Sequence, residues 1–158
     1  MFNLNYAGLH QAWWRFAQAD QGELLAGLGY EADVSASACL LDNGAVIASL
    51  AFLAQGIPVA GSRRIETGPL TGGKVFTGAN AMADWLANCF MPPETISIDR
   101  GLGDVADRLF GRRGIAAFIS GSGPQGGQIG LSDGSNGHLL CAGAQQKYPL
   151  EVRFWVLN

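Results

Sequence analysis

The feature that most constrains the fold is a run of eleven residues without a charged side chain, residues 45–55 (AVIASLAFLAQ). Asp42 and Asn43 precede the run and are residue types that cap helix N-termini, whereas Gly56 and Pro58 follow it and favour helix termination. A helix without a polar face must be buried on all sides. The run therefore predicts a helix through the centre of the molecule, around which the other elements pack.

Apolar periodicity predicts the elements that surround this helix. Residues 9–18 and 79–90 carry apolar side chains at helical spacing, which indicates two more helices. In the C-terminal half we expect strands at residues 115–119, 128–131 and 151–157, the first two joined by the glycine-rich hairpin connection 120–127. Helices followed by strands indicate an α+β fold, with N-terminal helices packed on a C-terminal antiparallel sheet. A chain of 158 residues is expected to form a single domain, residues 1–158.

Charge and composition exclude several classes of function. The net charge is −3 and the ten Lys and Arg residues are scattered, so we expect no nucleic-acid partner. No apolar run approaches the ~18 residues of a membrane span, and the N-terminus lacks the basic and apolar regions of a secretory signal. His10 and His138 have no second ligand at metal-binding spacing, so we expect neither a metal nor a cofactor.

The remaining chemistry-bearing side chains favour structural interpretations. The three cysteines, Cys39, Cys89 and Cys141, are expected to be buried and inert. His138 lies three residues before Cys141, but the two leucines between them favour the end of a structural strand. Trp13 and Trp14 lie beside an arginine, which is compatible with a stacking platform for a ligand. A core helix with one exposed tryptophan is the favoured interpretation.

Two segments carry a resemblance to a known family. Residues 43–49 (NGAVIAS) begin the buried helix, and residues 127–134 (GQIGLSDG) form the strand expected to face it. They resemble the fourth Tae family of type VI secretion amidase effectors, which are papain-like cysteine hydrolases of peptidoglycan. In that family the helix begins Asn-x-Cys-Ala-Ile and the strand reads Gly-His-Ile/Val-Asp-Leu-Trp. Residues 82–86, 111–118 and 152–157 match further segments of the family in the same order, so the resemblance implies a papain-like amidase fold.

The resemblance also places the catalytic positions of the family on residues that cannot perform its chemistry. The nucleophile position falls on Gly44, the general-base position on Gln128, and the third, acidic position on Asn136. Glycine cannot attack a peptide bond, and glutamine has no titratable proton near neutral pH. The resemblance therefore implies a catalytically degenerate scaffold. The rim of its groove is expected to include these positions together with Asn43, Trp13 and His138.

The function implied by the resemblance is binding, through the groove that corresponds to the family's active site, to peptidoglycan or to a protein partner such as an immunity protein. Such an effector is made in the cytoplasm and exported by the type VI secretion apparatus, towards the periplasm of a target cell. Two alternatives remain open. One is an active cell-wall hydrolase with a relocated catalytic pair, Cys39 and His138, and the other is an interaction toxin that keeps the fold but has a non-wall target.

Overall fold

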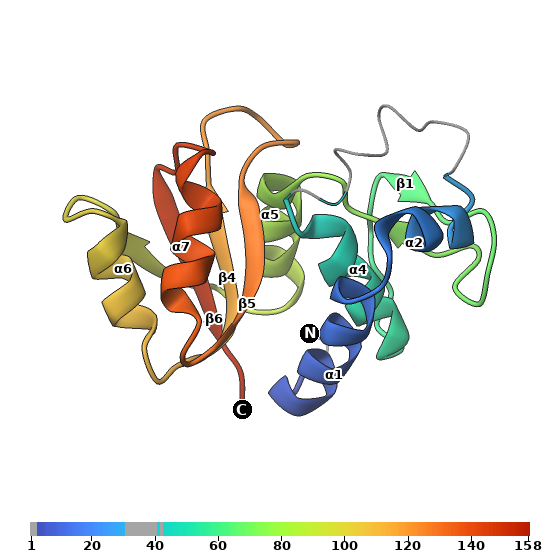
Figure 1. Cartoon of the computed structure of the whole chain (residues 1–158), viewed down its shortest axis with the longest axis horizontal. Helices are drawn as coiled ribbons and strands as arrows, with labels where there is room; N and C mark the ends of the chain where they lie inside the picture. Colours follow the sequence, from blue (N-terminus) through green and yellow to red (C-terminus); the bar gives the residue numbers. More distant parts are fainter. Residues whose placement is uncertain (1–2, 31–40, 42) are drawn as a thin grey trace.

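The computed structural model describes residues 3–30, 41 and 43–158 (Figure 1). Helices dominate the N-terminal half: α1 (Tyr6–Ala17), α2 (Gln21–Gly27), α4 (Ala45–Ala54) and α5 (Ala79–Cys89). A short two-stranded ribbon, β1 (Arg63–Arg64) and β2 (Lys74–Val75), lies between α4 and α5 in the sequence. The C-terminal half alternates strands and helices: β3 (Glu94–Ser97), α6 (Leu102–Leu109), β4 (Arg113–Ile119), β5 (Gln128–Asp133), α7 (Gly137–Gln145) and β6 (Glu151–Val156).

The main sheet has the strand order β3-β6-β4-β5, and all of its neighbours are antiparallel. Ile115 in the middle of β4 pairs with Leu131 of β5 on one side and with Trp155 of β6 on the other. The three predicted strands and the hairpin connection between β4 and β5 are thus confirmed, as is the α+β fold class. Strand β5 lies at one edge of the sheet, a position that determines the geometry of the candidate site.

Helices cover both faces of this sheet (Figure 1). One face packs against α1, α4 and α5 in a core that includes Ile129 and Trp155, and the other packs against α6 and α7 in a core that includes Phe118 and Phe154. The predicted packing of N-terminal helices on the sheet is confirmed for one face, and the helices on the other face were not predicted. His138 and Cys141 lie in α7, so the prediction of a strand end there was wrong. Strand β4 buries side chains on both of its faces, which requires a helical layer on the second face as well.

The central helix α4 is as the sequence predicts. Its residues from Ala45 to Phe52 are buried, and its one polar side chain among them is satisfied internally. The Ser49 hydroxyl donates to the Ala45 carbonyl at 2.8 Å and accepts the Phe76 N–H at 2.9 Å. At the N-terminus the side chain of Asn43 accepts the Ala45 N–H at 3.0 Å, while Asp42, the other predicted cap, lies outside the described residues. No helix in the described ranges is both long and apolar enough to cross a membrane.

Candidate functional site

The first turn of α4 is joined to the edge strand β5 through backbone contacts. The Ile129 N–H donates to the Asn43 carbonyl at 2.8 Å, and the Asn43 side-chain amide donates to the Thr77 carbonyl at 2.7 Å. Gly44 adopts a left-handed conformation, with φ of 80°, and its α-carbon faces the Ile129 carbonyl so closely that a β-carbon would overlap with that oxygen. The space that a nucleophilic side chain would need at residue 44 is thus occupied by the backbone of β5.

The side chain of Gln128 does not face Gly44. Ile129 packs into the core beside α4, whereas a β-carbon on Gly130 would point at Leu140 of α7, 2.7 Å from its Cδ2. Because successive residues of a strand point to opposite faces, Gln128 lies on the α7 face together with Gly130. The structure brings the backbones at the first two predicted catalytic positions together, but it directs the Gln128 side chain to the opposite face of the sheet.

Asn136, at the third position, caps the outer edge of β5. Its amide nitrogen donates to the Leu131 carbonyl at 2.9 Å, and its amide oxygen accepts the Asp133 N–H at 3.0 Å. These are the two groups that a neighbouring strand would otherwise bond. The side chain of Asn136 therefore satisfies two edge groups of β5 as a neighbouring strand would, and it uses both the donor and the acceptor of its carboxamide.

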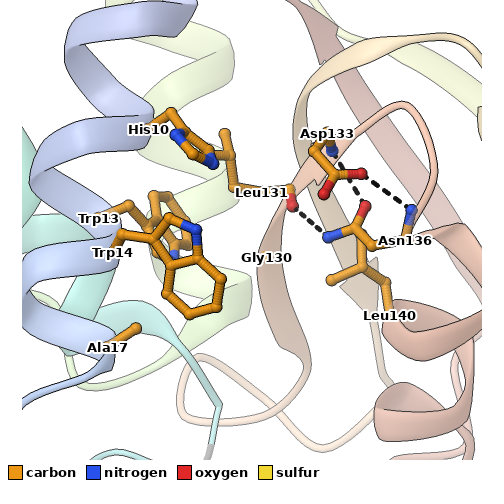
Figure 2. Close-up of a pocket in the computed structure, with 9 residues that line it drawn as sticks. All are labelled: His10, Trp13, Trp14, Ala17, Gly130, Leu131, Asp133, Asn136 and Leu140. Atoms are coloured by element: carbon orange, nitrogen blue, oxygen red, sulfur yellow. Dashed lines mark hydrogen bonds between the residues drawn. The ribbon is translucent and has the colours of Figure 1, made fainter.

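Beside this capped edge lies a pocket of about 180 Å³, bounded by α1, β5 and α7 (Figure 2). We call it the edge pocket. Figure 2 shows the side chains of His10, Trp13 and Trp14 extending from α1 towards β5, with Asp133 and Asn136 on the opposite side. Trp14 is 52% exposed, which is unusual for a tryptophan of a folded core. The complete lining is His10, Trp13, Trp14, Ala17, Gly130, Leu131, Asp133, Asn136 and Leu140.

Asp133 gives the edge pocket a fixed negative charge. Its Oδ1 accepts the Ser135 N–H at 2.7 Å, the Ser135 hydroxyl at 2.9 Å and the Asn136 N–H at 2.9 Å. These hydrogen bonds, with that from the Ser135 N–H the most important, hold the pKa of Asp133 below its usual value, and the nearby charge of His10 acts in the same direction. Its other oxygen, Oδ2, has no hydrogen-bond partner among the described residues and lies on the pocket side of the carboxylate in Figure 2.

The α1 wall of the edge pocket is built from aromatic rings. The His10 ring lies 5.3 Å from that of Tyr6 and meets the Trp14 ring edge-on at 6.4 Å between centroids. The guanidinium of Arg113 lies over the Tyr6 ring, 5.1 Å from its centroid. Burial raises the pKa of Tyr6; the charge of Asp133 acts in the same direction, and that of Arg113 opposes it.

The predicted site residues therefore separate into groups. Trp13 and Asn136 line the edge pocket; Asn43 and Gly44 form the backbone junction of α4 with β5; and His138 is exposed on α7 and does not line the edge pocket. Cys39, the alternative nucleophile, lies outside the described residues.

Three residues of the pocket, His10, Trp14 and Asp133, were not predicted as site residues. Positions 10, 13 and 14 have the i, i+3, i+4 spacing of one helix face, and this pattern is the signal that could have found the first two. Across the described residues no group of three or more His, Cys, Asp or Glu side chains is placed to hold a metal ion.

Comparison with known proteins identifies the fold. No protein-family model and no curated protein matches the chain. Among solved structures, the effector–immunity system Tae4/Tai4 from Salmonella typhimurium matches with a TM-score of 0.71 at 15% identity, covering 99% of this chain and 100% of that chain. The type VI effector Tae4 from Enterobacter cloacae matches with a TM-score of 0.68 at 18% identity over 100% of both chains. The Tae4–Tai4 complex from Enterobacter cloacae gives 0.65 at 18% identity, with 99% and 100% coverage. The chain therefore has the fold of the Tae4 effectors along its length, as the resemblance predicts.

Proposed function

We propose that this chain is a type VI secretion effector directed at peptidoglycan, and that it acts by binding without cysteine-dependent hydrolysis. The observation that carries the proposal is the junction at Gly44. The position to which the resemblance assigns the nucleophile is a glycine, and the Ile129 carbonyl fills the space that a side chain would need there. A covalent amidase needs an activated nucleophile at that point.

The other two positions support the same conclusion. A cysteine amidase needs a base within hydrogen-bond reach of its thiol, and a third group that orients the base. Gln128 lacks a titratable group and lies on the other face of the sheet, while Asn136 uses both ends of its carboxamide to cap β5. Gly44 and Asn136 thus serve the fold, and Gln128 offers no base.

The edge pocket is the binding site that we assign to this function. It lies along β5, the strand that carries the second family position, and it combines exposed aromatic surface with a carboxylate oxygen that lacks a partner among the described residues. An exposed tryptophan in an open pocket is typical of ligand contact. The solved relatives include complexes with the immunity protein Tai4, which supports an immunity-type protein partner for this chain too. We further propose export from the producing cell and action in the periplasm of a target cell.

Co-sedimentation with purified sacculi tests the proposal. The full chain is incubated with sacculi, and bound and free protein are measured together with soluble muropeptides. We expect binding without muropeptide release. Trp14→Ala should weaken the binding, whereas Phe110→Ala removes an aromatic ring that is 77% exposed and outside the edge pocket, and should bind like the wild type.

Two results would contradict the proposal. Absence of binding to sacculi, combined with toxicity when the chain is expressed in the cytoplasm and not when it is directed to the periplasm, would favour the toxin with a non-wall target. Release of muropeptides that is lost in Cys39→Ala or His138→Ala would favour the relocated hydrolase.

A further inference from the structure

We infer that the edge pocket binds an N-acetylated amino sugar of the glycan strand and does not bind the stem peptide. This inference rests on the proposed function, which it narrows to one chemical component of the wall. It is carried by the aromatic wall of the pocket, by one unpaired backbone N–H on β5, and by the way Asn136 closes the rest of that strand edge.

The aromatic wall suits the apolar face of a pyranose ring. Trp14 is 52% exposed and Trp13 is half-buried, and both side chains extend from α1 into the edge pocket (Figure 2). A flat indole surface packs well against a flat group that is apolar on its face and polar at its rim, because the aromatic body stays covered while the rim stays hydrated. A pocket of about 180 Å³ is smaller than the ~300–1,000 Å³ typical of sites for larger ligands, and this favours a single sugar ring.

The backbone of β5 offers one donor to such a ligand. Residues 129, 131 and 133 direct their backbone groups away from β4, because the Ile129 and Asp133 N–H groups both bond to partners outside the sheet. The Leu131 N–H points in this outward direction as well and has no acceptor in the described part of the chain. An acetamido carbonyl has the single strong acceptor that this N–H requires.

The same edge does not suit an extended peptide. A peptide that adds to a sheet needs alternating N–H and carbonyl groups along the strand. Here the Leu131 carbonyl and the Asp133 N–H are both occupied by Asn136, and the Ile129 carbonyl faces Gly44. A peptide would find the Leu131 N–H alone, whereas a sugar needs no more than this one backbone bond.

The charges of the pocket favour a neutral ligand. The Asp133 carboxylate already accepts three hydrogen bonds on Oδ1 and interacts electrostatically with His10, and Arg113 lies over the neighbouring Tyr6 ring. An ammonium group would lie near the Arg113 guanidinium as well as the carboxylate, because Arg113 and Asp133 pair across β4 and β5. The hydroxyl groups of a sugar can donate to Asp133 Oδ2 without bringing a further charge into the pocket.

Titration of the full chain with soluble oligosaccharides tests this inference. The probes are the tetramer of N-acetylglucosamine, its deacetylated form, cellotetraose and a wall stem tetrapeptide, with binding followed by calorimetry. We expect the N-acetylated tetramer to bind at least about tenfold more tightly than the other three, which is the effect of losing about one well-placed hydrogen bond. Trp14→Ala should weaken its binding by a similar factor, Trp14→Phe should recover part of it, and Phe110→Ala should leave it unchanged. Denaturant unfolding of each variant verifies that it is folded.

The outcomes separate this inference from the proposed function. Binding of sacculi and of the stem tetrapeptide, with no preference for the N-acetylated tetramer, would overturn the inference and leave the proposed function standing. Tight binding of the tetramer that is insensitive to Trp14→Ala would also overturn it, because the sugar would then lie elsewhere. Trp14-dependent binding of the tetramer without binding to sacculi would support the sugar site and contradict the proposed function.

Discussion

Replacing Gly44 by alanine tests the closed junction between α4 and β5. The left-handed backbone at Gly44 costs a residue with a β-carbon about 1–2 kcal/mol. In addition, the new β-carbon would overlap with the Ile129 carbonyl oxygen, so β5 must move away from α4. That movement strains the packed core, which costs about 1–3 kcal/mol of stability. It also weakens the Ile129–Asn43 hydrogen bond, which costs about 1 kcal/mol more. We therefore expect Gly44→Ala to lower the free energy of unfolding by about 3–6 kcal/mol.

Gly56, just beyond the other end of α4, supplies a matched control. It has nearly the same backbone conformation, with φ of 78°, but a β-carbon there would meet nothing within 4 Å. Gly56→Ala should therefore cost only the backbone contribution of about 1–2 kcal/mol. Urea unfolding measures both, and with a slope of about 2 kcal/mol/M the midpoints of the two variants should differ by about 1 M or more. Losses in the two variants that agree within about 0.5 kcal/mol would refute the closed junction.

Three further predictions concern single side chains. Asn136→Asp should destabilise the fold at pH 7 by about 2 kcal/mol, since a carboxylate cannot donate to the Leu131 carbonyl; thermal melts of equal midpoint would contradict the edge-capping role. Because the pKa of Asp133 is lowered by folding, its stabilising contribution is present above pH 3.8 and is lost as the pH falls through its folded pKa. Asp133→Asn should therefore flatten the acid side of the stability–pH curve, and an unchanged slope would count against this. The prediction that Cys89 is buried was wrong, because its side chain is exposed at the end of α5. Burial raises the pKa of Cys141 to about 11, so at pH 8 this thiol should be alkylated far more slowly than Cys89; equal rates in the native protein would disprove the burial of Cys141.

Much of the fold could be predicted because its strongest signals are local. The uncharged run at 45–55 has one stable solution, a buried helix, and the short apolar run at 115–119 indicates a buried strand. Helix α7 was missed because Gly137 and Gly143 weaken its helical pattern, and its buried positions, such as Cys141 and Ala144, become recognisable only beside α6. Local sequence could not show that the second face of the sheet needed these two helices.

The candidate site was less predictable because it joins distant segments. His10 and Asp133 are more than one hundred residues apart, and sequence does not say which edge of the sheet faces α1. The direction of Gln128 was equally hidden. Because side chains alternate along β5, Gln128 and Ile129 must face opposite sides of the sheet. Helices cover both sides, so the sequence alone does not tell which of the two residues faces Gly44.

The central claim is that this chain keeps the Tae4 fold without the cysteine chemistry, and the most direct test is the release of muropeptides from purified sacculi. The full chain is incubated with sacculi beside a peptidoglycan amidase of known activity, and soluble products are measured by mass spectrometry. Our account predicts no release above that of the heat-inactivated chain, while the active amidase digests the same sacculi. Release by the native chain that disappears in Cys39→Ala would contradict it, and would place the nucleophile at a position other than residue 44.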